Sequence, residues 1–294
     1  MMNFWKFHPL RLAFALGIAA LAVGSGCHGG PATVMSELSE ANRLAADLRV
    51  QFNKAADASN RAVMAETDEA SVAFANEAQQ TSLAIDRDVA AMSPILQAVG
   101  LPDELKLLEQ FGAQLSAFRN VDRTVLSLAV ENTNLKAQRL SFGSARAAAD
   151  RFKADLVLAP AVAAKDRCRG EALVNKAVLA VRELQTDQGP HIASSDEAAM
   201  TGIEHEMAAL EASTADALTA LSGLVEPSAL AAAQADFAEF KSIGSQIVTL
   251  SRRNSNVRSL DLSLRVKPPL ATACDDTLLA LERALANEGS KATR

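Results

Sequence analysis

An internal repeat constrains the fold of this chain more than any other feature of its sequence. Residues 118–142 and 240–264 align without a gap at a constant separation of 122 positions. The first segment contains Asn-Thr-Asn-Leu-Lys-Ala at 132–137, and the second contains Asn-Ser-Asn-Val-Arg-Ser at 254–259. A repeat of this kind predicts related structural units. We therefore expect two halves, residues 36–158 and 161–287.

The composition favours an all-α fold. The 294 residues are 49% hydrophobic but only 4% aromatic, and there is no tyrosine. β-Sandwiches and β-barrels are built from β-branched and aromatic strands with frequent turns, so these classes are disfavoured. Disorder is excluded because the apolar content is too high for the charge.

Helix-breaking residues divide each half into two helical stretches. Gly100–Asp103, Pro160 and Val225–Ser228 mark the boundaries. The expected helices are 36–99, 103–158, 161–223 and 227–287. Gln188–His191 should interrupt the third helix, and Pro268–Pro269 should kink the fourth. Short connections force antiparallel neighbours. The predicted fold is an elongated antiparallel up-down-up-down four-helix bundle, built from two duplicated long helical hairpins.

Residues three or four positions apart form the seam of a left-handed coiled coil in both copies. The seam positions are Phe118, Val121, Val125, Leu128, Asn132, Leu135, Arg139 and Phe142 in the first copy, and Phe240, Ile243, Ile247, Leu250, Asn254, Val257, Asp261 and Leu264 in the second. We expect the phenylalanines and leucines of this seam to be buried.

Two asparagines interrupt the seam at equivalent positions. One interpretation is structural, because a buried amide fixes the register of paired helices at some cost in stability. The alternative is a ligand site halfway along the bundle, level with Thr67–Ser71 and His191–Asp196. A small polar ligand would then be held by amides, with an arginine to attract a carboxylate. The residues of this candidate ligand site are Asn132, Asn134, Asn254, Asn256, His191 and Arg253.

Arg139 and Asp261 stand seven positions beyond these asparagines and carry opposite charges. An unpaired charge between helices costs several kcal/mol. We therefore expect Arg139 and Asp261 to form a buried ion pair or to reach water.

The N-terminus has the features of an export signal. Lys6 and Arg11 give a short positive region, and the apolar run Leu12–Val23 is too short to cross a hydrocarbon layer of roughly 30 Å comfortably. Small residues and Cys27 follow, an arrangement that resembles the lipobox of bacterial lipoproteins. The match is imperfect because Gly24 replaces the usual leucine.

This signal predicts the organisation of both ends of the chain. We expect residues 1–26 to be a signal peptide of lipoprotein type, Cys27 to be acylated, residues 27–35 to form a tether and residues 288–294 a flexible tail. The protein would then be periplasmic and lipid-anchored to a membrane of the bacterial cell envelope. Ordinary cleavage after residues 20–22 and an uncleaved anchor are the alternatives.

Export to an oxidising compartment also bears on the other two cysteines. The distances of the two cysteines from the turn near Val225, measured along the helices, differ by about two helical turns. An interruption in the third helix can compensate for that difference. We expect a disulfide between Cys168 and Cys274. Two buried free thiols are the alternative.

The sequence shows no arrangement typical of an enzyme. Glu204-His205-Glu206 lacks the second Glu-His copy that a di-iron bundle needs. Motifs for covalent haem, a nucleophile elbow and a phosphate-binding loop are also missing. We therefore expect no catalytic residues, no metal and no cofactor. The net charge of −6 speaks against a nucleic-acid partner.

Residues 128–142 and 250–264 resemble segments of bacterial proteins that carry the four-helix-bundle sensor domain of methyl-accepting chemotaxis receptors. The resemblance implies an extracytoplasmic bundle that senses small molecules or a binding-protein partner, often as a dimer. The chain departs from such a receptor, because we find no second membrane span, no HAMP linker and no methylation hairpin. We therefore expect it to pass information through a partner.

Two functions follow from these expectations. The first is a non-catalytic, lipid-anchored sensor that binds a small polar ligand or a protein partner, with a membrane signalling protein or a second copy of the chain as the expected partner. The second is a structural envelope lipoprotein that acts as a coiled-coil spacer or scaffold.

Overall fold

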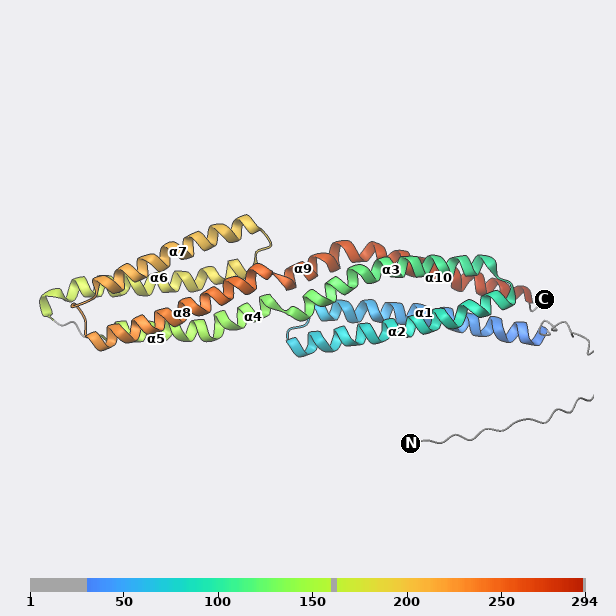
Figure 1. Cartoon of the computed structure of the whole chain (residues 1–294), viewed down its shortest axis with the longest axis horizontal. Helices are drawn as coiled ribbons and strands as arrows, with labels where there is room; N and C mark the ends of the chain where they lie inside the picture. The colour runs from blue at the N-terminus through green and yellow to red at the C-terminus, as the bar shows by residue number, and fades with distance from the viewer. Residues whose placement is uncertain (1–30, 160–162, 293–294) are drawn as a thin grey trace, which may run out of the picture.

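The computed structural model describes residues 31–159 and 163–292 of the chain. These residues are helical with short connections and contain no β-strand, so the all-α prediction is confirmed. The helices form one elongated body, with both ends of the described chain at the same extremity (Figure 1). The expected signal peptide, residues 1–26, and Cys27 lie outside the described residues.

Each half of the repeat contributes a helical hairpin followed by one long segmented helix. The elements of the first half are α1 (Pro31–Val63), α2 (Asp68–Val99), α3 (Pro102–Glu131), α4 (Thr133–Leu140), the π-helix η1 (Ser141–Ala145) and α5 (Arg146–Val157). Those of the second half are the 3-10 turn η2 (Ala164–Asp166), α6 (Arg167–Ala193), α7 (Glu197–Ala220), α8 (Pro227–Arg253), α9 (Ser255–Asp261), the π-helix η3 (Leu262–Val266) and α10 (Lys267–Ala292).

The expected first and third helices are each a complete hairpin, which corrects the prediction of a single four-helix bundle. The chain reverses between α1 and α2 and between α6 and α7. A residue with a short oxygen-bearing side chain begins the return helix in both cases. The Thr67 hydroxyl accepts a hydrogen bond from the Ala70 N–H, and the Asp196 carboxylate accepts from the Ala198 and Ala199 N–H groups. These N-caps favour a new helix start over a continuous helix.

The helices pack as two units placed end to end (Figure 1). The terminal unit consists of α1, α2, α3 and α10, and the distal unit of α5, α6, α7 and α8. The two long helices pass from one unit to the other, and they contact each other through α4 and α9. We call this crossing the junction. Each long helix therefore begins in the unit of its own hairpin and ends in the unit of the other.

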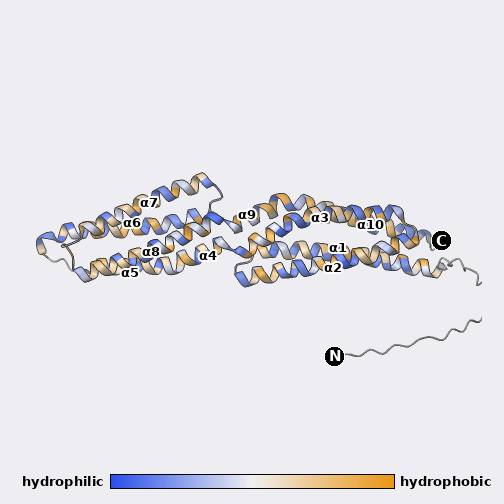
Figure 2. Cartoon of the chain, viewed as in Figure 1, coloured by the Kyte–Doolittle hydropathy of each residue, from blue (hydrophilic) through white to orange (hydrophobic). Residues whose placement is uncertain are grey.

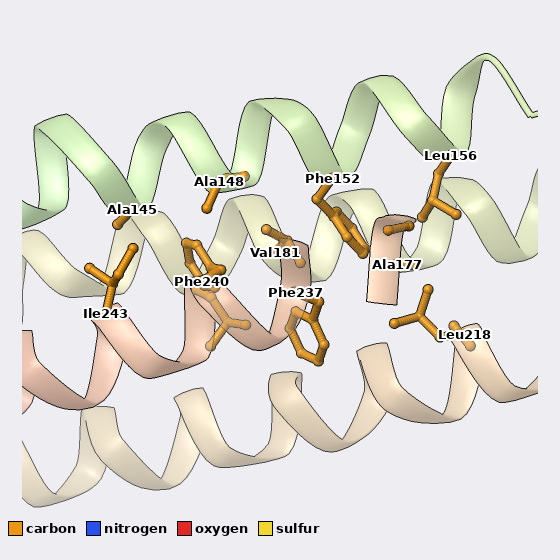
Figure 3. Close-up of a cluster of buried hydrophobic side chains, with 14 of the residues drawn as sticks. Ala145, Ala148, Phe152, Leu156, Ala177, Val181, Leu218, Phe237, Phe240 and Ile243 are labelled. Carbon is orange, nitrogen blue, oxygen red and sulfur yellow. The ribbon is translucent and has the colours of Figure 1, made fainter. Parts of the chain in front are cut away.

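Each unit has its own aromatic and aliphatic core. In the terminal unit, the ring of Phe52 packs edge-on against those of Phe111 and Phe118 at centroid distances of 6.2 and 5.1 Å. In the distal unit, Phe152 and Phe237 lie 5.8 Å apart between α5 and α8 (Figure 3). Alanines fill much of the remaining space, which lets the helices approach closely.

Two apolar residues of the predicted seam are exposed rather than buried. Phe142 is 72% exposed and its equivalent Leu264 is 68% exposed. Both lie inside a π-helix, where the wider turn rotates the following residues away from the seam. Pro268 and Pro269, where we expect a kink, lie in the first turn of α10, directly after η3. The first copy forms the π-helix η1 at the same place without prolines, so the prolines alone do not explain it.

The structure also corrects the expected tether and tail. Residues 31–35 belong to α1, and residues 288–292 belong to α10. Figure 2 shows hydrophilic and hydrophobic residues interleaved along the helices. Accordingly, none of the helices in the described ranges is long and apolar enough to cross a membrane.

Candidate functional site

The two long helices change direction at the junction through the repeated asparagines. Asn132 and Asn254 adopt left-handed backbone conformations, with φ of 49° and 53°. They are the only described non-glycine residues with positive φ. Asparagine tolerates this region better than most residues because its short side chain can hydrogen-bond locally. Each asparagine thereby ends one helix and begins the next.

Reciprocal hydrogen bonds join the two copies at this point. The Thr133 N–H donates to Ser255 Oγ at 3.0 Å, and the Ser255 N–H donates to Thr133 Oγ1 at 3.0 Å. The N–H groups of Asn134 and Asn256 each donate to the other's Oδ1 at 3.1 Å. The first N–H groups of α4 and α9, which no intrahelical carbonyl can satisfy, are therefore capped by the other copy. Equivalent residues meet each other, as expected around a two-fold axis.

The amides of the predicted ligand site also bind one another. Asn134 Nδ2 donates to Asn254 Oδ1 at 2.8 Å and to the Ile192 carbonyl at 2.7 Å, and Asn256 Nδ2 donates to Asn132 Oδ1 at 2.9 Å. Asn254 Nδ2 donates to the Ser194 carbonyl at 2.8 Å. Only the Asn132 Nδ2 group, among these side-chain amides, lacks a partner in the described chain. The four asparagines therefore bind across the two copies, and their side-chain amides are almost fully satisfied without a ligand.

Arg253, predicted to attract a ligand carboxylate, binds a carboxylate of the protein instead. Its Nε and Nη2 atoms donate to the two oxygens of Glu131 at 2.6 Å each. Residues 131 and 253 are equivalent in the repeat, so the two copies carry complementary charges where they meet. The Arg253 guanidinium lowers the pKa of Glu131.

His191, the last predicted ligand residue, is fully buried near the end of α6. Its Nδ1 lies 2.8 Å from Ser251 Oγ, and its Nε2 lies 2.9 Å from Glu204 Oε1. Glu204 also accepts hydrogen bonds from Arg252, which lower its pKa to about 2, with His191 adding to the effect. Serine, histidine and glutamate therefore form a chain that resembles a catalytic triad. His191 and Ser251 have no exposed surface, so a substrate has no route to them in this conformation.

The expected pair of Arg139 and Asp261 does not form. Arg139 Nη1 binds Asp68 on α2 at 3.0 Å, and Asp261 binds Arg265 one turn along its own helix at 2.9 Å. Both side chains are about half exposed. Both residues precede the π-helices and lie in α4 and α9, the short helices that follow the left-handed asparagines.

The expected disulfide is also wrong. Cys168 is a free, exposed thiol at the start of α6, whereas Cys274 is a free, buried thiol in the core of the terminal unit. The reversal of α6 and α7 places the two cysteines in different units. Burial raises the pKa of Cys274 to about 12.

Sequence reasoning missed a second buried polar cluster, in the terminal unit. Lys267 Nζ lies 2.8 Å from Ser59 Oγ and 3.3 Å from Asp122 Oδ1, and Ser59 also donates to Asp122. Lys267 is 3% exposed, and this burial lowers its pKa. Asp122 and Lys267 align in the repeat with Gly244 and Ala145. A comparison of the two copies position by position was the available signal.

Two grooves lie beside these polar clusters. One, of about 560 Å³, runs between α2 and α3 in the terminal unit, above Asp122. The other, of about 700 Å³, lies at the junction and is lined by Ser195, Asn254, Arg252 and Arg258 among others. Neither is a closed cavity within the core.

No protein-family model matches the chain, and no curated protein matches it. The side chains of the described residues also form no cluster of three or more histidines, cysteines or carboxylates that could hold a metal ion.

Proposed function

We propose that the protein is a non-catalytic, sensor-like helical protein that binds a small ligand and passes the binding event to a partner. The proposal includes export by the N-terminal signal and attachment to a bacterial envelope membrane through Cys27. It also includes kinship with the four-helix-bundle sensor domains of chemotaxis receptors, for which the two repeated segments are the support.

One observation carries the ligand-binding part of this proposal. The terminal unit contains the buried Asp122–Lys267 ion pair below an open groove, whereas the distal unit has Gly244 and Ala145 at the equivalent positions. A buried ion pair gives little or no net stability, because the desolvation of two charges offsets their attraction. The distal unit packs without such a pair. The presence of this ion pair in the terminal unit is therefore better explained by a function of that unit than by a need of the fold.

The junction supplies a route between the units. Both long helices run through it, and their left-handed asparagines are capped across the pseudo-two-fold axis. A ligand that shifts α3 or α10 in the terminal unit would therefore shift α4 and α9, which continue into the distal unit. Discrete arrangements of packed helices transmit binding energy in this way.

A thermal-shift screen of small metabolites tests the proposal on the chain starting at His28, which retains every described residue. A ligand present at 100 times its Kd stabilises the folded state by about 2.7 kcal/mol, which is readily measured. The proposal predicts at least one saturable hit. The absence of any stabilising compound across a broad library of acids, amines, sugars and nucleotides would count against it.

The second candidate function is a structural spacer. The mutual satisfaction of the junction asparagines favours it, because such amides fix the register of helices and need no ligand. A spacer predicts that the screen finds nothing and that scattering of the chain in solution shows one elongated shape under all conditions.

A further inference from the structure

The groove between α2 and α3 has an apolar floor and a cationic rim. Its floor is made of small and branched apolar side chains, and polar side chains line its edges. The floor residues are Ala75, Ala78, Leu126 and the partly buried Val130, whereas Val72, which also lines the groove, is 45% exposed. The rim includes Arg119 and Arg123 from α3 and Asn76 and Gln79 from α2. A volume of about 560 Å³ falls within the range of small-molecule sites.

The two arginines are differently engaged. Arg119 binds Asp86 at 2.7 Å and the Ser82 carbonyl at 2.8 Å, and its buried Nε has no partner. Arg123 is exposed and forms no ion pair or hydrogen bond with any residue in the part of the chain that the structure describes. The groove therefore has one free guanidinium and a positive balance of charge.

The charges below the groove balance each other. Asp122 lines the groove, but Lys267 balances its charge from below. An anion placed over Asp122 would thus meet a neutral pair flanked by two guanidinium groups. A cation would meet no uncompensated carboxylate among these groups, so the charges favour a negative ligand.

The distal unit lacks parts of this arrangement, although Lys241 stands at the position of Arg119 and Val248 at that of Leu126. Arg123 is replaced there by Ser245, and Val130 by Arg252, which crosses from α8 to bind Glu204 on α7. The groove and its charge are therefore a specialisation of one copy.

We infer that the α2–α3 groove binds a small amphipathic carboxylate, with its apolar body over Ala75, Ala78 and Leu126 and its carboxylate on Arg123. This inference rests on the proposed ligand-binding function and names its site and ligand class. Charge-assisted hydrogen bonds from a guanidinium hold a carboxylate, and the apolar floor removes the chain of the ligand from water.

Titration calorimetry with octanoate, below its micelle concentration, tests the inference on the chain starting at His28. The matched neutral probe is 1-octanol, which has the same chain without the charge. We expect octanoate to bind at a saturable site. The affinity for 1-octanol should be lower than that for octanoate by a factor of roughly ten or more. Shorter acids should bind progressively less tightly, because each buried methylene contributes to affinity.

Four variants locate the site. Arg123→Gln should weaken octanoate roughly tenfold, and Asn76→Trp, which places a large ring on the exposed rim, should abolish binding. Arg169→Gln removes a charge from the distal unit, and Arg258→Gln removes one from the junction groove. Both should leave octanoate affinity unchanged, and circular dichroism should show all four variants folded.

Three results overturn the inference. They are equal binding of octanoate and octanol, loss of binding in Arg258→Gln but not in Arg123→Gln, and no binding of any acid in the series. If the metabolite screen still yields a ligand whose affinity Arg123→Gln leaves unchanged, the site is wrong while the proposed function stands. If neither the screen nor the series yields a ligand, both fail.

Discussion

At the scale of the residue, the chain buries reactive groups in closed hydrogen-bond networks. In the chain Ser251–His191–Glu204 the serine hydroxyl lies 2.8 Å from the imidazole, and in the second cluster the Ser59 hydroxyl accepts from the Lys267 ammonium at 2.8 Å and donates to the Asp122 carboxylate. Such pairs activate nucleophiles when a substrate reaches them. Here the hydroxyls have no exposed surface, and their neighbours are satisfied within the protein. Proximity of the right residue types is therefore not enough to assign catalysis.

Glu204 should make stability depend on acid pH. Its folded pKa of about 2 lies below the ordinary value of 4.5. Its stabilising effect is therefore complete above pH 4.5 and is lost as the pH falls towards 2. Glu204→Gln should lower the free energy of unfolding at pH 7 by on the order of 1–3 kcal/mol and flatten its decline between pH 5 and 2. Urea unfolding at several pH values measures both effects. Glu206→Gln, an exposed neighbour on the same helix, is the control and should change neither.

The two cysteines should differ in reactivity. Cys168 is exposed, whereas burial keeps Cys274 protonated far above neutral pH. Because the thiolate is the reactive form, iodoacetamide should label Cys168 in the folded protein and reach Cys274 only after unfolding. Mass spectrometry without reductant measures the labels. A mass two units below that of the dithiol, with no labelling after unfolding, would show that the two cysteines form a disulfide and would contradict the structure.

At the scale of the element, single residues decide where helices end and turn. Asn132 and Asn254 allow each long helix to change direction while the two long helices stay in contact with each other. Thr67 and Asp196 reverse the chain, and the π-helices rotate the following faces outward. The resulting path is set by a few positions in otherwise ordinary helical sequence.

Asn254 should tolerate glycine better than alanine. Alanine is strained at a φ of 53°, whereas glycine is not, so Asn254→Ala should be less stable than Asn254→Gly by about 1 kcal/mol. Both variants should be less stable than the wild type because Asn134 loses an acceptor. Thermal unfolding measures the order. At Ser245, an exposed helical position, alanine should be the better residue, and the same order at both sites would show that φ is not the cause.

The sequence predicts some of these elements better than others. The long second and fourth helices and the meeting of segments 132–134 and 254–256 follow from an ungapped repeat, which can be read directly from the sequence. The reversals at Thr67 and Asp196 cannot be predicted from the repeat. In sequence, a capping residue followed by more helix-forming residues resembles a brief interruption of one long helix. The π-helices are also invisible, since their extra residue shifts the seam without altering the composition. The buried pair of Asp122 and Lys267 depends on contacts between distant segments.

At the scale of the whole molecule, two units share two helices. Complementary charges at equivalent positions support this exchange, since Glu131 and Arg253 meet where an exact repeat would place like charges together. Because the ion pair joins the two copies, its loss weakens the contact between them rather than either core.

Exchanging the charges of Glu131 and Arg253 tests the contact between the two copies. Glu131→Arg and Arg253→Glu should each lower the free energy of unfolding by a small but measurable amount, because the pair is partly exposed and each change creates a repulsion. The double variant, which restores opposite charges in reverse order, should recover most of the loss. A double-mutant cycle by chemical denaturation measures the coupling. Additive losses in the double variant would mean that the two side chains do not interact.

The exchange of long helices also determines where the polypeptide can be divided. The distal unit is formed by one continuous stretch inserted between α3 and α10, and both ends of that stretch lie at the junction. Residues 133–261 are therefore the fragment to express alone. Cutting near residue 160, where the repeat suggests a boundary, would leave each piece without one of its four helices and would expose apolar surface on both. The boundary between duplicated sequences thus falls in the middle of a folding unit.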